Sequence, residues 1–351
     1  MAKIKFKIGD KKIQENGDVF IIAEAGVNHN GRLDLALKLV DLAADVGADA
    51  VKFQTFQAEE VVIPSGEMAA YQIKNIVMKK TQLEMLRQLS LPSTFYRSII
   101  DRCKKRHIIF LSTPQGGRPS VDFLEKLNIP AYKIDSGNLT NYLLLDYIAK
   151  LKKPIILSTG MATIPEIKEA VYFIESRRNK KIAILHCTTD YPCKITDVNF
   201  QVMLHMMKQY FYPIGYSDHS LDNQVAIMAA TLGAAIYEFH ITLDKTLQGP
   251  DHQASADPSD ASIRISSIRK TGKIMGSLIK PAQSELRYIS KVRRSLVYTS
   301  NLKSGQILTD GNIEGKRPAD GVPAKDFLKY VGKKLKRDVV VNQQLSKADF
   351  T

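Results

Sequence analysis

The stretch FIIAEAGVNHNGRLDLALKLVDLAADVGADAVKFQ, residues 20–54, decides the fold, because it combines a strand, a helix and a second strand. The apolar runs at 20–25 and 50–54 are typical of buried strands. Between them, apolar side chains recur at the helical period, at Leu35, Leu39, Leu42 and Val46. A connection long enough to hold a helix lets the two strands run parallel in one sheet.

The same alternation continues along the chain. Strand-like runs occur at 20–25, 50–54, 108–112, 131–134, 155–158, 182–186, 214–217 and 236–240. Helical patterns separate them, among them 34–46, 121–127, 164–174 and 223–232. Eight strand–helix units are the number that closes a parallel barrel of about 250 residues. We therefore expect a (β/α)8 TIM barrel over residues 1–280, with an open doubly wound sheet as the alternative.

One connection inside the expected barrel is unusually long. It spans residues 58–93 and contains a predicted helix at 82–89. Long insertions after a strand are commonly lids or substrate loops. We expect such a role here, with a plain surface loop as the alternative.

The composition changes after Gly276. Residues 281–294 have the character of a linker, and 295–351 show short strand patterns at 296–298 and 338–341, separated by turn residues. We expect a separate small, mostly β domain at 295–351.

Composition excludes several classes of protein. Hydrophobic residues make up 44% and charged residues 25%, which is usual for a globular protein. No apolar run approaches the roughly 20 residues of a membrane span, and the polar N-terminus does not resemble a secretory signal. The three cysteines, Cys103, Cys187 and Cys193, are too few for a disulfide framework and suit a reducing compartment. We expect a cytoplasmic protein without a membrane partner.

The formal charge of +14 raises the question of a nucleic-acid partner. Residues 285–351 carry 14 lysines and arginines against 7 aspartates and glutamates. The rest of the charge is dispersed, and no nucleic-acid-binding module is recognisable. An anionic small substrate explains the lysines more economically.

Polar side chains follow all eight expected strands, where each strand ends. In chain order they are Glu24, Asn28 and His29; Lys52 and Gln54; Ser112 and Thr113; Lys133, Asp135, Ser136 and Asn138; Ser158 and Thr159; His186, Thr188, Thr189 and Tyr191; Ser217, Asp218 and His219; and Glu238 and His240, followed by Asp251 and His252. Singly, such a hydroxyl often caps a helix, and such a histidine is often a core residue. Eight polar ends together predict an active site at this face of the barrel.

The residue types indicate the chemistry. Two lysines among hydroxyl groups favour a substrate that carries phosphate and carboxylate. His219 and His240 end adjacent strands and could converge on one divalent cation such as manganese, zinc or cobalt. The alternative is that one or both histidines only bond a neighbouring carboxylate.

Six short segments resemble the signatures of the sialic acid synthase family, which includes N-acetylneuraminate, legionaminate and pseudaminate synthases. They are IAEAGVNHNG (22–31), VKFQTF (51–56), LSTGM (157–161), LHCTTDYP (185–192), GYSDHS (215–220) and GPDH (249–252). The segment RRSLVYTSNLKSGQILTDGNIEGKRPADGV (293–322) resembles the C-terminal antifreeze-like (SAF) domain of that family.

The resemblance implies a metal-dependent transferase that condenses phosphoenolpyruvate with N-acetylmannosamine or a related N-acyl amino sugar and releases phosphate. The metal would be Mn²⁺, with Mg²⁺ or Co²⁺ possible. A legionaminate or pseudaminate synthase acting on a 2,4-diacetamido-trideoxyhexose is the alternative. An aldolase that uses a Schiff-base lysine and a non-catalytic sugar-binding protein are more distant ones.

The resemblance also assigns roles to residues. Glu24, Lys52 and Lys133 would be catalytic, and His219 and His240 would bind the metal. The phosphoenolpyruvate ligands would be Lys52, Thr113, Lys133, Ser136, Ser158, Thr189 and Ser217. The sugar ligands would be Gln54, Asn138, Tyr191, Asp251 and Arg317. Because the family's arginine reaches into the partner subunit's barrel, Arg317 implies a domain-swapped homodimer.

Two positions depart from the family pattern. Asn138 stands where the family usually has a glutamate that contacts the sugar, and Thr189 stands where many members have asparagine. An amide both donates and accepts hydrogen bonds, whereas a carboxylate only accepts, so the first change bears on the identity of the sugar. The stretch YQIK…KKTQLEML (71–86) resembles legionaminate-type members.

Overall fold

The computed structural model describes residues 3–68, 72–73 and 81–350. The chain divides into two compact units, Met1–Gly276 and Ser277–Thr351. The division lies just before residue 280, where we expect the barrel domain to end.

The first unit is a closed barrel of eight parallel strands in the order β10-β3-β4-β5-β6-β7-β8-β9. The strands are β3 (Phe20–Gly26), β4 (Ala50–Thr55), β5 (Ile109–Pro114), β6 (Tyr132–Ile134), β7 (Ile155–Ser158), β8 (Ile182–Cys187), β9 (Ile214–Asp218) and β10 (Ile236–His240). The last strand pairs with the first, Ile236 opposite Phe20, so the sheet has no edge. The expected barrel is confirmed, and the open doubly wound sheet is wrong.

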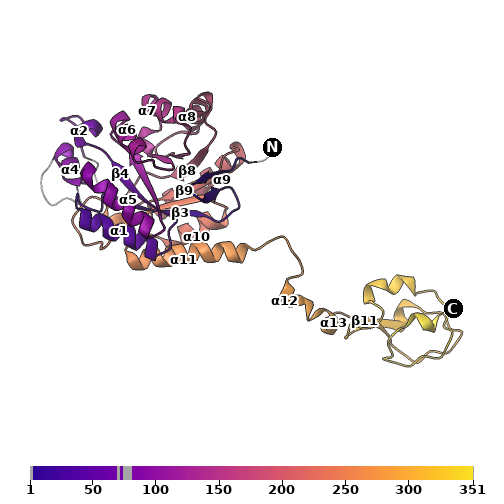
Figure 1. The fold of residues 1–351 in the computed structure, drawn as a ribbon. Helices are drawn as coiled ribbons and strands as arrows, with labels where there is room; N and C mark the ends of the chain where they lie inside the picture. The colour runs from indigo at the N-terminus through magenta and orange to yellow at the C-terminus, as the bar shows by residue number, and fades with distance from the viewer. Residues whose placement is uncertain (1–2, 69–71, 74–80, 351) are drawn as a thin grey trace. The chain divides into compact units, whose positions relative to one another are not determined.

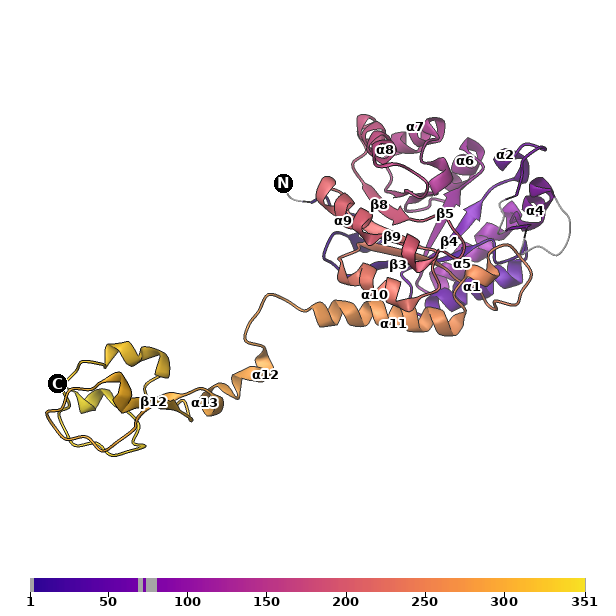
Figure 2. The same cartoon turned by 180° about the vertical axis from the view of Figure 1, so that it is seen from behind.

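Helices surround the barrel (Figures 1 and 2). They are α1 (Leu33–Asp45), α5 (Tyr96–Lys105), α6 (Arg118–Lys126), α7 (Tyr142–Lys150), α8 (Ile164–Ser176), α9 (Phe200–Gln209), α10 (Asn223–Thr231) and α11 (Pro258–Met275). Local sequence starts several of them. Thr163 caps α8 in a capping box with Glu166, and Asp257 caps α11 by accepting from the amide of Asp260.

Strand alternation creates two separate cores. Outward-facing residues such as Ile21 and Val51 pack against the helices, whereas inward-facing residues such as Ile22 and Leu111 form a core inside the barrel. The hairpin of β1 (Phe6–Ile8) and β2 (Lys11–Ile13) packs its apolar side chains against this inner core. The inner core fills the barrel up to the level at which polar side chains begin.

The long connection after β4 contains α2 (Ala58–Val61), α4 (Gln82–Leu89) and a 3-10 turn, η1 (Ser93–Phe95). The predicted helix at 82–89 is therefore confirmed. Thr81 caps α4. The apolar side of this helix packs against Val27 and Phe56 beside the barrel mouth. Within the stretch 71–86, residues 71 and 74–80 lie outside the described residues. The role of the connection as a lid stays a prediction.

The second unit begins with α12 (Gln283–Leu286) and α13 (Ile289–Val292). Its only named strands in the described part are β11 (Ser295–Tyr298) and β12 (Ile313–Lys316), which pair antiparallel. The remainder is turns and 3-10 segments, η5 (Asp310–Asn312), η6 (Ala324–Lys329) and η7 (Lys347–Asp349), around a small core of its own. The strand expected at 338–341 is wrong, because that segment contributes only an isolated bridge from Val339 to Leu302.

No helix within the described ranges is both long enough and apolar enough to cross a membrane.

Candidate active site

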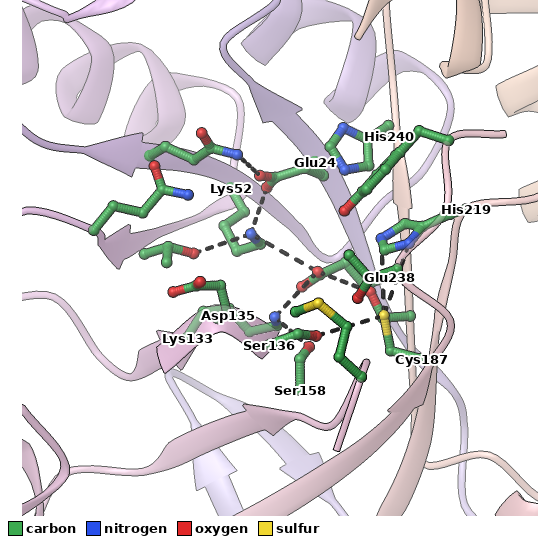
Figure 3. Close-up of a pocket in the computed structure, with 18 residues that line it drawn as sticks. Glu24, Lys52, Lys133, Asp135, Ser136, Ser158, Cys187, His219, Glu238 and His240 are labelled. Atoms are coloured by element: carbon green, nitrogen blue, oxygen red, sulfur yellow. Dashed lines mark hydrogen bonds and ion pairs between the residues drawn. The ribbon is translucent and has the colours of Figure 1, made fainter. Parts of the chain in front are cut away.

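A cavity of about 130 Å³ opens at the C-terminal ends of the barrel strands. All eight strands, or the loops directly after them, contribute to its wall. The lining residues are Glu24, Lys52, Gln54, Thr113, Gln115, Lys133, Asp135, Ser136, Gly137, Ser158, Met161, Cys187, Thr189, Tyr191, Ser217, His219, Glu238 and His240. The polar strand ends thus converge on one pocket (Figure 3).

The direction of these side chains follows from the strand period of two. On β4, Ala50 lies in the inner core, so Lys52 and Gln54 also point inward, one level higher each. On β10, Ile236 lies in the inner core and places Glu238 and His240 in the pocket. The apolar residues at the strand starts therefore determine which polar residues line the pocket.

Four charged side chains meet at the floor of the pocket. Lys52 Nζ lies 2.7 Å from Glu24 Oε2 and 3.8 Å from Glu238 Oε1, and Lys133 Nζ lies 3.4 Å from the same Glu238 oxygen. The four side chains are at most 6% exposed. Two lysines and two carboxylates thus compensate one another before any substrate is bound (Figure 3).

The pKa values of the two carboxylates are shifted in opposite directions. Burial raises the pKa of Glu24, although Lys52 opposes this. Burial also acts to raise the pKa of Glu238, but the charges of Lys133 and Lys52 outweigh it and hold that pKa below its usual value. For Lys52, burial acts to lower the pKa, and the charges of Glu238 and Glu24 raise it. Glu238 is therefore the carboxylate whose ionised form the two lysines favour.

Hydroxyl groups surround the lysines. Lys133 donates to Ser158 Oγ at 2.5 Å, and Lys52 donates to Thr113 Oγ1 at 3.1 Å. Ser217 donates to Glu238 Oε1 at 3.2 Å. The second oxygen, Glu238 Oε2, is buried and has no hydrogen-bond partner among the described residues. One oxygen of Glu238 is thus fixed, while the other is available to a ligand.

A glycine brings two more hydroxyls together. Gly160 donates its amide to Ser136 Oγ at 2.9 Å. A Cβ at Gly160 would lie 2.1 Å from Thr189 Oγ1 and 2.7 Å from Ser136 Oγ, so only glycine fits between them. The next residue, Met161, has a left-handed backbone with φ of 63° and is 71% exposed at the pocket.

The rings of the two histidines meet edge to face with centroids 5.7 Å apart, and the Tyr191 ring lies 4.0 Å from that of His219, tilted by 30°. His219 Nδ1 lies 2.7 Å from the carbonyl oxygen of Thr188. Because a carbonyl only accepts, Nδ1 carries a proton, and Nε2 is the nitrogen that could bind a cation. His240 Nδ1 is buried without a partner in the described part of the chain.

These histidines fit a divalent cation. Burial and the positive charges of His219 and Lys52 hold the pKa of His240 well below its usual value, so its imidazole is neutral, as a metal ligand must be. Over the described ranges, no three His, Cys, Asp or Glu side chains form a metal-binding group. The donor set is therefore two nitrogens, and water or substrate oxygens would complete the coordination shell.

Cys187 lies between His219 and Ser136 in the pocket wall. Its Sγ is 3.8 Å from His219 Nδ1 and 3.8 Å from Ser136 Oγ. Burial acts to lower the pKa of His219, but the Cys187 sulfur raises it above its usual value. A cation at His219 Nε2 would therefore compete with a proton for that nitrogen.

Twelve of the predicted site residues line the pocket, and three do not. The amide of Asn138 donates to Asp135 Oδ1 at 2.7 Å and accepts from Asn141 at 2.9 Å, and Asp135 is the residue that lines the pocket. Asp251 is buried near Glu24 and His219, and burial together with the Glu24 charge raises its pKa to about 6. Arg317 belongs to the second unit, where it donates to the carbonyl of Val292 at 3.1 Å.

Several lining residues had no assigned role in the sequence-based prediction. Glu238 and Asp135 lie two residues from His240 and Lys133, so the strand period could have placed them on the inner face. Gln115 follows Thr113 by the same spacing. No sequence signal marks Met161 as a pocket residue.

Other polar strand ends serve the fold. Asn28 donates to the carbonyl of Ile241 at 2.8 Å and to Ser255 Oγ at 2.9 Å. His252 Nδ1 lies 2.7 Å from Thr242 Oγ1, and His186 Nε2 lies 2.8 Å from the carbonyl of Val198. These polar residues therefore stabilise the fold, as the sequence analysis allowed for single polar strand ends.

Comparisons with known proteins find similar sequences and a similar fold. The sequence profile of the NeuB family matches residues 39–280, and that of the SAF domain matches 293–351. The chain is 43% identical to the N,N'-diacetyllegionaminic acid synthase of Campylobacter jejuni, over 89% of this chain and 94% of that protein. It is 39% identical to the enzyme of the same name from Legionella pneumophila, over 90% of each chain. A crystal structure of N-acetylneuraminic acid synthetase from Leptospira borgpetersenii superposes with a TM-score of 0.73 at 33% identity, covering 82% of this chain and 95% of that one.

Proposed function

The chain belongs to the NeuB family, and we propose that it is a nonulosonic acid synthase, a transferase that condenses phosphoenolpyruvate with an N-acyl amino sugar and releases phosphate. The single observation that carries this proposal is the pocket in which Lys52 and Lys133 lie opposite His219 and His240. The lysines provide for an anionic substrate, and the histidines provide for a cation beside it.

We propose that phosphoenolpyruvate binds over the two lysines. Lys52, Thr113, Lys133, Ser136, Ser158, Thr189 and Ser217 all line the pocket and offer ammonium or hydroxyl donors to phosphate and carboxylate oxygens. Positive charge that is already fixed in a buried site stabilises developing negative charge more than it would in water. The lysines would therefore assist the departure of phosphate.

His219 and His240 would hold a divalent cation, and we propose Mn²⁺, with Mg²⁺ or Co²⁺ as alternatives. When bound, such an ion supplies Lewis-acid polarisation of the sugar aldehyde. Two observations support this assignment. His240 Nδ1 has no hydrogen-bond partner in the described part of the chain, and His219 Nδ1 is bonded to the carbonyl of Thr188.

The residues of the chain account for the remaining steps. C3 of phosphoenolpyruvate forms the new bond to the aldehyde carbon, the aldehyde oxygen takes up a proton and becomes a hydroxyl, and a cation is left at C2. Water adds at C2, and we propose that Glu238 Oε2 accepts its proton, because this oxygen is buried in the pocket wall without a partner in the described residues. The C2–O bond to phosphate then breaks, and a keto group forms as the C2 hydroxyl loses its proton. Glu24, held by Lys52, would support the cation or position the water.

We propose a 2,4-diacetamido-trideoxyhexose as the sugar, and N-acetylmannosamine as the alternative. The two relatives at 43% and 39% identity are named diacetyllegionaminic acid synthases, which supports the first. Asp135, Gln54, Gln115 and Tyr191 lie in the pocket and could contact such a sugar, and Asp251 is buried nearby. Asn138 would act on the sugar through Asp135, to which it donates.

We further propose a domain-swapped homodimer in which Arg317 of one chain serves the barrel of the other. The match of residues 293–351 to the SAF domain supports the presence of the domain that carries this arginine.

A phosphate-release assay tests the proposal. Purified protein, phosphoenolpyruvate and Mn²⁺ are combined with N-acetylmannosamine, its 6-phosphate or the diacetamido-trideoxy sugar. We expect release with the last sugar that requires both substrates and stops with EDTA. Release that survives EDTA would contradict the roles of His219 and His240. Borohydride trapping with pyruvate separates the Schiff-base alternative, and we expect no adduct.

A further inference from the structure

The turn that carries His219 is held from two sides. On the pocket side, His219 Nδ1 donates to the carbonyl of Thr188 at 2.7 Å. On the outer side, Asp218 Oδ1 accepts from the amide of Ser220 at 2.8 Å. The residues before and after His219 are therefore tied to each other by the Asp218 carboxylate.

One arginine holds this turn from outside the barrel. Arg264 of α11 is 3% exposed and donates from Nη1 to Asp218 Oδ2 at 3.1 Å. The same guanidinium donates to the carbonyl of Ser220 at 3.3 and 3.4 Å. It thus bonds the residues on both sides of His219.

The same network reaches the strand that carries the other histidine. Arg264 Nη1 donates to the hydroxyl oxygen of Tyr237 at 3.2 Å, and that hydroxyl donates to Asp218 Oδ2. Tyr237 lies on β10, three residues before His240 in the sequence. Helix α11 packs against α10 (Figures 1 and 2). A single guanidinium therefore connects α11 with the strands of both histidines.

Stability alone does not explain this network. A buried ion pair costs desolvation, and apolar residues of similar volume often stabilise a fold as well or better. The planar guanidinium fixes the orientation of its partners, because its donors bond several acceptors at once in a rigid arrangement. Partners that orient metal-binding histidines commonly set the metal affinity of a site.

We propose that Arg264 is a positioning residue that sets the orientation of His219, and through it the metal affinity of the pocket, by holding Asp218 and Ser220. Arg264 is absent from the residues found to line the pocket, so it acts through the turn and not on a substrate. The inference rests on the proposed metal site at His219 and His240.

Arg269 offers a matched control on the same helix. Its Nη2 lies 2.6 Å from Asp49 Oδ2 and its Nη1 donates to the carbonyl of Val19 at 2.6 Å. Asp49 and Val19 precede β4 and β3, at the opposite end of the barrel from the pocket. Arg269→Met therefore removes another ion-paired anchor of α11, at a more exposed arginine, without touching the His219 turn.

The experiment measures free Mn²⁺ by electron paramagnetic resonance in titrations of the full chain, which needs no turnover. We expect Arg264→Met to weaken Mn²⁺ binding about 10- to 100-fold. Arg264→Lys, which keeps the positive charge, should weaken it less. Arg269→Met should bind Mn²⁺ as the wild type does. Calorimetry without metal should show phosphoenolpyruvate affinity unchanged in all three.

The double variant Asp218→Asn with Arg264→Met covers the case in which the single variant fails to fold. It removes both charges and keeps an acceptor for the Ser220 amide. We expect it to fold and still to bind Mn²⁺ about tenfold more weakly or worse. Wild-type Mn²⁺ affinity in the folded Arg264 variants would overturn the inference. Wild-type affinity in His219→Ala would instead overturn the proposed metal site on which it rests.

Discussion

The ammonium of Lys133 lies 2.5 Å from Ser158 Oγ, across the pairing of β6 with β7, and 3.4 Å from Glu238 Oε1. Lys133 is thus held in place by a hydroxyl and a carboxylate before substrate arrives. A phosphate that enters the pocket meets a charge whose position is already set, which reduces the reorganisation that binding requires.

Replacing that charge tests the anion site. We expect Lys133→Met to reduce kcat/KM for phosphoenolpyruvate at least about 1,000-fold, because a charge-assisted bond to phosphate is lost and Glu238 loses a partner. Steady-state kinetics and calorimetry with phosphoenolpyruvate measure the effect. Lys153→Met, which removes a partly exposed ion pair with Glu125, serves as the control and should behave as the wild type. Near-normal phosphoenolpyruvate affinity in Lys133→Met would contradict the assignment.

Glu238→Gln tests the proposed base. The glutamine keeps the acceptor for Ser217 but cannot take a proton from water. We expect kcat to fall about 100- to 10,000-fold, with KM for phosphoenolpyruvate unchanged or lower. Rapid-quench measurement of phosphate release checks this. A loss confined to KM would show that Glu238 only compensates the lysines.

The raised pKa of Asp251 predicts that the free energy of unfolding depends on pH. Burial and the charge of Glu24 raise the pKa of Asp251 from 3.8 to about 6. The folded state therefore binds this proton more tightly than the unfolded state, so ionisation lowers stability as pH rises from about 4 to about 6. Asp251→Asn removes this penalty, and we expect the metal-free variant to gain up to about 3 kcal/mol at pH 7 and nothing below pH 4. Urea unfolding at several pH values measures it, and a gain independent of pH would contradict the cause.

Asp349 anchors the second unit. It is fully buried and accepts from Tyr298 at 2.9 Å, Arg337 Nε at 2.7 Å and the amide of Ser346 at 2.7 Å. We expect Asp349→Ala to destabilise this unit by about 3 kcal/mol, because three donors lose their acceptor. Calorimetry should show one lowered transition and an unchanged barrel transition. Asp338→Ala, which breaks an exposed pair with Lys303, should leave both unchanged.

Subunit complementation tests the proposed exchange of Arg317. Lys133→Met and Arg317→Ala should each be inactive alone. If Arg317 serves the partner's barrel, coexpressed variants form dimers with one intact site, and activity returns to about a quarter of wild type. If the arginine serves its own barrel, mixing restores nothing.

Sequence patterns were sufficient to predict which side chains of several strands point into the pocket. On β4, the apolar Ala50 and the period of two place Lys52 and Gln54 inside, so their convergence with other strand ends follows from the closed barrel. The same reasoning reaches Glu238 from His240, although the sequence analysis assigned Glu238 no role. The strand expected at 338–341 is wrong because that segment pairs only through Val339, and β-propensity does not supply a partner.

The sequence by itself determined the barrel, the second unit and which strand ends carry lysine, hydroxyl and imidazole, because alternation and strand-end position are local properties of the chain. Only the tertiary structure decided which polar groups are already occupied: Asn138 by Asp135 and Asn141, and Glu238 by Lys133 through one oxygen but not the other. Folding brings together groups far apart in sequence, such as Asp218 and Arg264. Burial then makes each unpaired atom costly, so the unpaired Glu238 Oε2 and His240 Nδ1 in the described pocket support the proposed ligand site.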